Sequence, residues 1–230
     1  FWDNDRRLNK RFSSFNCSAR EAIRDTLKDL IHEEQKDNPV YQANVQKCTS
    51  HRILESILMN NIEASPPHFT ATDVEYMEDT NNGGVTGRFT YGSIKDVFEW
   101  MKLERQKSIF LDLGSGIGGP VLHAAIEGAY AAFGVEINAD VYRSCLCNLN
   151  SATDADQVRL NCPIGFAKLD FGELGDTPAT HVYAFCVDEN MQRNVLLFVL
   201  RCPAVRLVFL VGTHGGAVHK EMWAICDEDK

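Results

Sequence analysis

The chain lacks three features that would assign a protein to a class at once. No apolar run in its 230 residues is long enough to cross a bilayer, so we expect no membrane contact. Its eight cysteines include no Cys-x-x-Cys pair, so a zinc finger is not predicted. There is no excess of basic residues either, because the formal charge is −9. Nucleic acid is therefore not an obvious direct partner, whereas a basic protein would suit an acidic surface.

The composition is that of an ordinary globular protein. Hydrophobic residues make up 44% and charged residues 24% of the chain, and its length allows one sizeable core plus a small appendage. Several cysteines, such as Cys186 and Cys202, lie in apolar runs, where a free thiol behaves as a small hydrophobic group. We therefore expect a reducing, intracellular compartment. Because the first residue is Phe1 rather than Met, we also expect a piece of a longer protein.

A glycine-rich stretch from Ile109 to Val121 organises the rest of the chain. An apolar run ends in Asp112, and glycines follow at 114, 116 and 118 before an apolar segment with a helical pattern. A buried strand that passes into a helix through such a turn forms a pocket for a nucleotide-like ligand. Because many tight turns use glycine, a purely structural turn remains an alternative.

Two acidic residues narrow the class of ligand. Asp112 precedes the first glycine, and Glu136 ends the next apolar run, where a carboxylate can accept hydrogen bonds from both ribose hydroxyls. Asp112 would repel a pyrophosphate, but it would attract the sulfonium and ammonium groups of S-adenosylmethionine. The pattern therefore favours a methyl-donor site over a nucleotide site.

Apolar runs alternate with helical patterns over the second half of the chain. We expect strands near 109–113, 131–136, 166–171, 181–187 and 205–211, and helices over 94–101, 120–127, 139–150 and 190–200. This alternation predicts an α/β fold with a doubly wound, mostly parallel sheet. The acids at 112, 136, 170 and 188 follow strands, so we expect them at the carboxyl edge of the sheet, where ligands bind.

The first part of the chain has a different character. A basic arm (Arg6, Arg7, Lys10 and Arg11) precedes two helical patterns, the second over about 45–59. No periodicity is visible from residue 60 to residue 88. We expect a mobile loop whose end near Tyr91 becomes ordered when the ligand binds, and a loop that merely tethers the N-terminal helices remains an alternative. We therefore predict an N-terminal helical region over 1–60, a linker over 61–88 and a catalytic domain over 89–230.

Four motifs in this order resemble one enzyme family. They are Asp112-Leu-Gly-Ser-Gly-Ile-Gly118, Tyr91-Gly92 upstream of it, Val135-Glu136, and Asp170-Phe171. Over about residues 88–215 the chain resembles the non-SET histone lysine methyltransferases of the disruptor-of-telomeric-silencing type. The compact chain is most similar to a divergent protist member, of the trypanosome kind.

The resemblance implies the fold of class I S-adenosylmethionine-dependent methyltransferases and methyl transfer to a lysine on the globular core of histone H3 in nucleosomes. S-adenosylhomocysteine would be the product, no metal would be needed, and the enzyme would be a nuclear chromatin regulator. We expect a monomer. The basic arm is a candidate for DNA contact, and a solvated arm without a docking role remains the alternative. The residues assigned to the acceptor channel are Tyr91, Phe185, Cys186 and Asp188. The residues assigned to the cofactor are Tyr91, Gly92, Ser93, Ile94, Phe110, Leu111, Asp112, Leu113, Gly114, Ser115, Gly116, Ile117, Gly118, Gly119, Glu136, Asp170 and Phe171.

The chain departs from the family pattern at three places. Ser93-Ile94 stand where the family has Glu-Thr, Gly119 replaces a glutamine, and the segment 185–188, where the family's asparagine beside the acceptor channel would fall, contains no asparagine. The donor end is therefore better supported than the lysine end. A methyltransferase for another protein or a small molecule, and a non-catalytic cofactor-binding module, remain alternatives. Three histidines, His123, His214 and His219, are expected to be structural or exposed.

Overall fold

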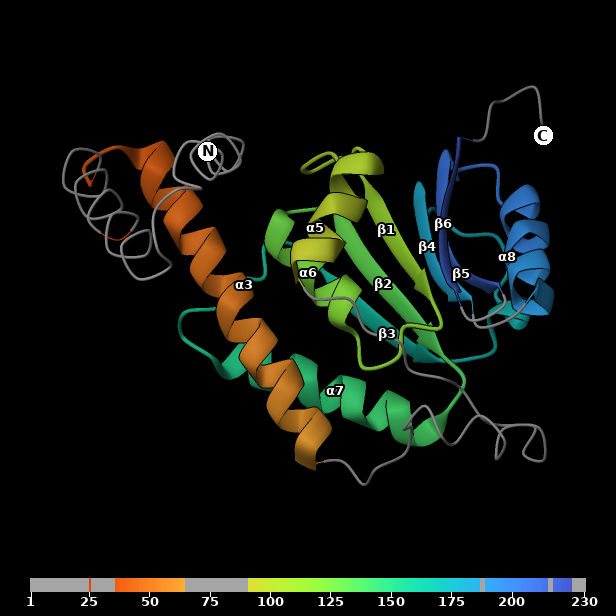
Figure 1. Ribbon diagram of the computed structural model, residues 1–230, viewed down its shortest axis with the longest axis horizontal. Coiled ribbons are helices and arrows are strands. Elements are labelled where there is room, and N and C mark those ends of the chain that lie inside the picture. The colour runs from red at the N-terminus through yellow and green to blue at the C-terminus, as the bar shows by residue number, and fades with distance from the viewer. Residues whose placement is uncertain (1–24, 26–35, 65–90, 187–188, 215–216, 225–230) are drawn as a thin grey trace, which may run out of the picture. The chain divides into compact units, whose positions relative to one another are not determined.

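The computed structural model describes residues 25, 36–64, 91–186, 189–214 and 217–224 (Figure 1). The chain divides into two compact units, residues 1–46 and 47–230. The predicted basic arm, most of the first predicted helix and residues 65–88 of the predicted linker lie outside the described residues. Helix α3 (Pro39–Ala64) contains the predicted helix 45–59 and extends beyond both of its ends. Residues 61–64, predicted as the start of the linker, are therefore helical.

The second unit consists of alternating strands and helices around one sheet (Figure 1). After α3, its elements are α5 (Tyr91–Trp100), β1 (Ile109–Leu113), α6 (Gly119–Glu127), β2 (Ala131–Glu136), α7 (Ala139–Asp154), β3 (Ile164–Lys168), η2 (Phe171–Glu173), β4 (His181–Cys186), α8 (Glu189–Arg201), β5 (Leu207–His214) and β6 (Ala217–Ala224). The strand order is β3-β2-β1-β4-β5-β6. The first five strands are parallel and β6 is antiparallel to β5, which confirms the predicted doubly wound fold. Strand β6 was not predicted, because charged and apolar residues are mixed in it without a clear period of two.

The order of the strands places a crevice at the end of β1. The chain winds outward from β1 through β2 to β3, and then returns to place β4 on the other side of β1. Leu113, the last residue of β1, is paired with Val135 of β2 and Ala184 of β4. Glu136 is the next residue of β2 and therefore lies beside the glycine-rich turn. Ligands of such sheets bind at this kind of switch point.

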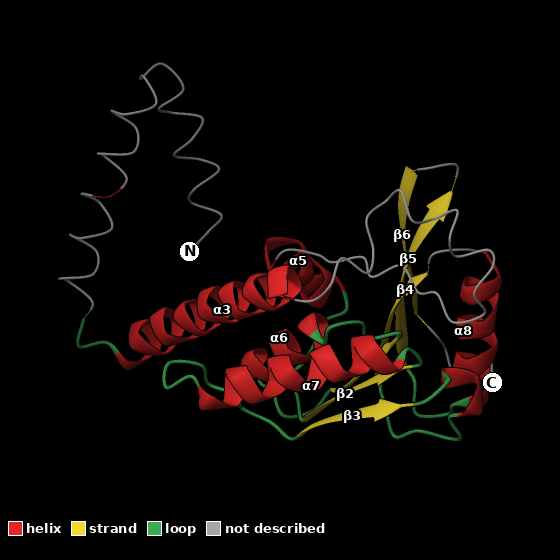
Figure 2. Cartoon of the chain, turned by 90° about the horizontal axis from the view of Figure 1, so that it is seen from below, coloured by secondary structure: helices red, strands yellow, loops and turns green. Residues whose placement is uncertain are grey.

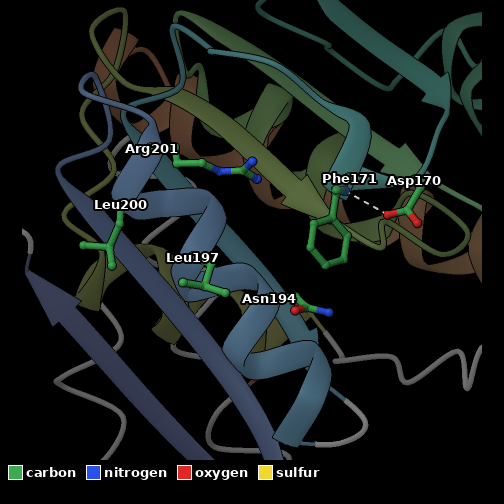
Figure 3. Close-up of a pocket in the computed structure, with 7 residues that line it drawn as sticks. Asp170, Phe171, Asn194, Leu197, Leu200 and Arg201 are labelled. Atoms are coloured by element: carbon green, nitrogen blue, oxygen red, sulfur yellow. Dashed lines mark hydrogen bonds between the residues drawn. The ribbon is translucent and has the colours of Figure 1, made fainter.

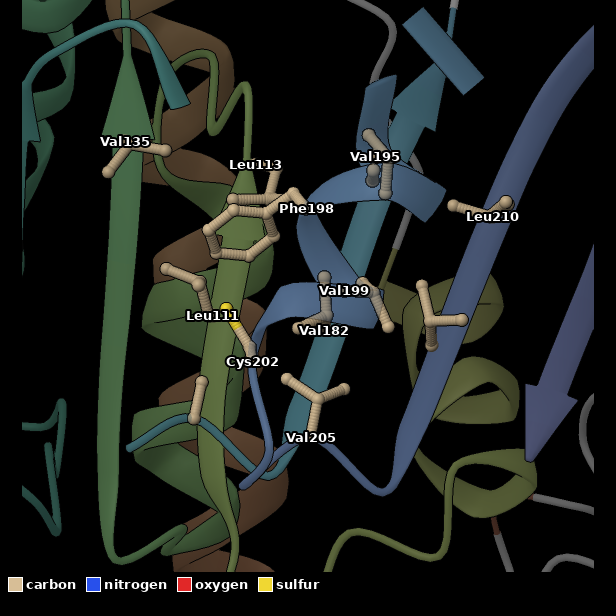
Figure 4. Packing of buried hydrophobic residues seen from close by; sticks show 13 residues of the cluster. Leu111, Leu113, Val135, Val182, Val195, Phe198, Val199, Cys202, Val205 and Leu210 are labelled. Atoms are coloured by element: carbon tan, nitrogen blue, oxygen red, sulfur yellow. The ribbon is translucent and has the colours of Figure 1, made fainter. Parts of the chain in front are cut away.

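Each face of the sheet packs against its own helices. Alternate residues of the strands, such as Leu111, Val182 and Leu210, pack against Phe198 and other apolar residues of α8 (Figure 4). The residues between them, such as Phe110, pack against α5 and α6 on the opposite face. Figure 2 shows α8 on one side of the sheet and α5, α6 and α7 on the other. Two buried faces explain why the strands read as nearly continuous apolar runs.

The part of α3 that belongs to the second unit packs against α6 and α7. Leu54 and Leu58 are buried and share a cluster with Leu122, Ile126 and Ala152. Side chains four residues apart lie on one face of a helix, so one stripe of α3 is committed to this cluster.

Candidate functional site

Backbone hydrogen bonds fasten the glycine-rich turn to the end of β2. The N–H groups of Gly114 and Ser115 both donate to the carbonyl oxygen of Val135, at 3.0 and 2.9 Å. The N–H of Gly118 donates to the carbonyl oxygen of Ser115 at 2.9 Å, which closes the turn before α6. The turn is thus fixed at the carboxyl edge of the sheet, as the sequence predicted.

Two glycines are required for close packing around this turn. Gly118 has φ +86°, and an added Cβ would lie 2.7 Å from Sγ of Cys145 on α7. Gly134 lies within β2, and a Cβ there would lie 2.7 Å from Cβ of Ser115. Gly134 was not singled out from the sequence, because a glycine inside an apolar run carries no motif. Its role becomes visible only when β2 and the turn are placed side by side.

Glu136 links the turn to the start of α7. One carboxylate oxygen accepts the N–H of Gly116 at 2.9 Å, and the other accepts the N–H of Asn138, the N-cap of α7, at 2.8 Å. Only 8% of Glu136 is exposed. Burial raises the pKa of this carboxyl, and the backbone hydrogen bonds oppose the increase. Each carboxylate oxygen can accept a second hydrogen bond, so the pair of ribose hydroxyls remains a chemically suitable ligand.

Asp112 is the most unusual residue of the site. It is 1% exposed, and among the described residues neither carboxylate oxygen has a hydrogen-bond partner. Ser115, three residues further along the chain, has a buried hydroxyl that also lacks a hydrogen-bond partner among the described residues. Burial, followed by the charge of Glu136, raises the pKa of Asp112 well above its ordinary value. A buried carboxyl without a partner costs stability unless a ligand pairs with it, and a cationic ligand would do so.

Asp170 is the N-cap of η2 and Phe171 is its first residue, beyond the end of β3. Asp170 is exposed, and its Oδ1 accepts the N–H of Gly172 at 2.8 Å (Figure 3). Phe171 is half-buried and packs against the core cluster of α8. Together with Gly172 and four residues of α8 they line an open pocket of about 530 Å³; the four are Asn194, Leu197, Leu200 and Arg201. The second oxygen of Asp170 can therefore accept from an amino group beside an aromatic ring.

Several residues that were assigned to the cofactor serve mainly as core. Phe110, Leu111, Leu113 and Ile94 are buried within the two apolar clusters of the sheet. Ile117 packs partly against the cluster of α3 and α6. The side chains of Phe110, Leu111, Leu113 and Ile94 therefore belong to the core.

The structure does not bring Tyr91 to the glycine-rich turn. Its hydroxyl donates to Oε1 of Glu127 at 3.2 Å, and its ring stacks on His51 with centroids 3.8 Å apart. Glu127 ends α6, about 12 Å of helix beyond Gly119. The Tyr91 side chain is therefore directed toward the far end of α6, although we had expected it to lie over the ligand.

The acceptor end of the site is less completely described. Phe185 is partly buried against the cluster of α5 and α6. Cys186 ends β4, but its side chain is not described, and Asp188 lies outside the described residues. The acceptor channel therefore stays a prediction.

Sequence reasoning missed one cluster of functional groups. His51 and Glu55 of α3 meet His123 and Glu127 of α6. These residues are separated by about 70 positions in the chain, so no motif connects them. The described part of the chain contains no group of His, Cys, Asp and Glu residues that could hold a metal ion.

Comparisons with known proteins agree with the resemblance inferred from the sequence. Residues 71–153, a little over a third of the chain, match the family described as histone methylation protein DOT1. The matched segment contains the glycine-rich turn and Glu136 but ends before Asp170. The match confirms the resemblance to this family over that segment, while the expected protist origin stays a prediction. No curated protein sequence matches the chain.

Solved structures with a similar fold include distant methyltransferases. An RNA methyltransferase from Salinibacter ruber in complex with S-adenosyl-L-homocysteine has 21% identity and a TM-score of 0.47, with 56% of this chain and 80% of that chain covered. A SAM-dependent methyltransferase from Thiobacillus denitrificans has 15% identity and a TM-score of 0.44, with 62% of this chain and 55% of that chain covered. Because these similarities are low, the fold assignment rests on the strand order of this chain. No helix among the described residues has the length and apolarity of a membrane span.

Proposed function

From the match of residues 71–153 to the DOT1 histone methylation family, we propose that this chain binds S-adenosylmethionine and transfers its methyl group to a histone lysine. The observation that carries the proposal is Asp112, a buried carboxyl without a partner beside the glycine-rich turn. Such a group is unfavourable in the free protein and becomes favourable when a cation binds against it. The methyl donor carries an ammonium and a sulfonium.

The residues at the carboxyl edge fit this cofactor. Asp112 would neutralise positive charge, and Glu136 would accept the ribose hydroxyls with the lone pairs that Gly116 and Asn138 leave free. Asp170 would accept from the adenine amino group, and the Phe171 ring would contact the base. When bound, the cofactor supplies a methyl group on a positively charged sulfur, which an amine can attack in line.

The contribution of the protein to such a reaction is positioning. The turn is fixed to β2 by the hydrogen bonds to Val135, so a ligand on the turn would be held at a defined place. A lysine has an ordinary pKa near 10.4 and must lose a proton before it can attack. An apolar channel favours the neutral amine, and Phe185 is the candidate for its wall.

We propose histone H3 within nucleosomes as the substrate. Two observations support it: the family match, and the net charge of −9, which suits a basic partner. The basic arm, Arg6 to Arg11, would supply the local positive charge needed beside nucleosomal DNA. Such an enzyme would act on chromatin in the nucleus.

Radiolabelled methyl transfer to nucleosomes, free histones and small amines tests the proposal. The parent chain should label a histone, and Asp112→Asn should remove the label. Asp156→Asn makes the same chemical change at an exposed position and should retain it. Labelling of small amines but not of histones would contradict the substrate, and undiminished labelling by Asp112→Asn would contradict the site.

A further inference from the structure

A buried polar cluster joins α3, α5 and α6 away from the proposed cofactor site. We call it the histidine clasp; it consists of His51, Glu55, Tyr91, His123 and Glu127. Nδ1 of His51 lies 2.9 Å from Nδ1 of His123. Nε2 of His51 lies 3.1 Å from Oε1 of Glu127, and Nε2 of His123 lies 2.9 Å from Oε1 of Glu55. Both rings are almost fully buried, at 0% and 1% exposure.

These contacts determine how many protons the two rings hold. Each Nε2 faces a carboxylate oxygen, so each must carry a hydrogen. A neutral imidazole has only one N–H, so two neutral rings would leave both Nδ1 atoms bare. Two bare nitrogens 2.9 Å apart repel each other, whereas a hydrogen between them makes a normal hydrogen bond. The clasp therefore requires one proton more than two neutral rings carry.

The additional proton belongs on His123. Imidazole is a stronger base than a carboxylate, so an imidazolium beside ionised Glu55 is preferred to a protonated Glu55. Burial is the main cause that lowers the pKa of His51, to about 4, and a charge on His123 lowers it further. His51 thus remains neutral, accepts at Nδ1 from His123, and donates from Nε2 to Glu127.

Other charged groups face the clasp from the same three helices. On α3, Lys47 pairs with Oε2 of Glu127 at 3.0 Å, and Cys48 interacts electrostatically with Tyr91. The His51 and Lys47 contacts lower the pKa of Glu127 to about 2, against the effect of burial. On α5, burial and then Glu127 raise the pKa of Tyr91, with Glu99 acting in the same direction, so its hydroxyl stays neutral. In the unfolded chain, both histidines titrate near pH 6.5.

We propose that the histidine clasp is a pH-sensitive lock, in which His51 and His123 share one proton and fasten α3 and the start of α5 to α6. The lock is tightest where two free histidines would together hold one proton, which is near pH 6.5. It loosens on both sides of that pH. The proposal does not depend on the proposed methyl transfer.

Proton counting gives the direction of the effect. Counted beyond the neutral rings, two unfolded histidines hold two additional protons at low pH, an average of one near pH 6.5, and none at high pH. The intact clasp holds one additional proton at every pH at which it is formed. Stability rises with pH wherever the unfolded state holds more protons, so it rises below pH 6.5 and falls above it. The lowered pKa of His51 causes the loss of stability below pH 6.5, and retention of the proton on His123 causes the loss of stability above it.

Unfolding by denaturant between pH 5 and 8 tests the lock in the full chain. At each pH, the unfolding equilibrium constant of the double variant His51→Gln/His123→Gln is divided by that of the parent. Their ratio should be largest near pH 6.5 and should change by up to about tenfold per pH unit on either side. His181→Gln is the control, because His181 lies on β4 outside the clasp. Burial lowers the pKa of His181, so the unfolding constant of His181→Gln divided by that of the parent should change in one direction only, rising with pH. A ratio for the double variant that changes in one direction only would overturn the proposal.

The protonation state of the parent chain provides a second measurement that needs no variant to fold. Nitrogen NMR of the two imidazole rings at pH 6.5 should show three protonated ring nitrogens out of four. Two protonated nitrogens would mean that the additional proton is absent or lies on Glu55, and would overturn the assignment to His123.

Discussion

Oε2 of Glu136 accepts the backbone N–H of Gly116 at 2.9 Å, so the proposed ribose acceptor also supports the glycine-rich turn. The same carboxylate holds the N–H of Asn138, the N-cap of α7. Substitution of Glu136 should therefore affect stability as well as ligand binding.

Glu136→Ala should lower the free energy of unfolding by about 1–3 kcal/mol, because two buried N–H groups lose their acceptor. It should also weaken S-adenosylmethionine binding roughly tenfold to a hundredfold. Denaturant unfolding and calorimetric titration measure the two effects. The matched control is Glu173→Ala at an exposed position of η2, which should change neither. Loss of affinity at full stability would show that Glu136 does not hold the turn.

Asp112→Asn should stabilise the free protein at neutral pH by about 1–3 kcal/mol. Burial raises the pKa of Asp112 in the folded protein above its pKa in the unfolded chain. The protein is therefore most stable with respect to this group below the unfolded-state pKa, and it loses that stability as pH rises through the folded-state pKa. Asparagine removes this loss because it never ionises. Thermal unfolding of parent and variant at pH 4 and pH 7.5 measures the difference in stability. The stability gained by Asp112→Asn should be larger at pH 7.5. An equal gain at both pH values would contradict the buried, unpaired carboxyl.

The affinity for S-adenosylmethionine should increase with pH by at most about tenfold per pH unit. Burial raises the pKa of Asp112 in the free protein, and a bound cation favours the ionised form and so lowers this pKa. Binding should therefore release a proton. Calorimetry in two buffers of different ionisation enthalpy measures the release, and uptake of a proton on binding would be the contrary outcome.

Gly118→Ala should destabilise the protein by about 1–3 kcal/mol and weaken ligand binding. The backbone has φ +86°, and the new methyl group would lie 2.7 Å from Sγ of Cys145. Gly175→Ala is the control, since a Cβ there meets nothing within 4 Å. Denaturant unfolding of both variants measures the difference. If Gly118→Ala were as stable as Gly175→Ala, α7 would be able to move away from the turn.

The sequence was sufficient for the elements whose signal is local. The run that ends in Asp112, the glycines after it and Glu136 defined two strands, a turn and the edge of the sheet, and parallel pairing brought them together as expected. The capping side chain of Asn138 and the apolar face of α8 follow the same local rules.

Other features depend on contacts between distant segments, so the sequence could not reveal them. His51 and His123 each lie on a helix without any motif, and only the packing of α3 on α6 makes them neighbours. The orientation of Tyr91 follows from the same packing, because the ring of His51 and the carboxylate of Glu127 are available to it. The burial of Glu136 follows from two backbone donors that approach it from different loops.

Asp112 and Glu136 together form the proposed site for a cationic methyl donor. Calorimetric titration of S-adenosylmethionine into the parent chain and into Asp112→Asn tests this assignment. The parent should bind one molecule per chain, and Asp112→Asn should bind at least about tenfold more weakly while remaining folded. A folded parent chain that binds no S-adenosylmethionine, or an Asp112→Asn variant with the affinity of the parent, would contradict this assignment.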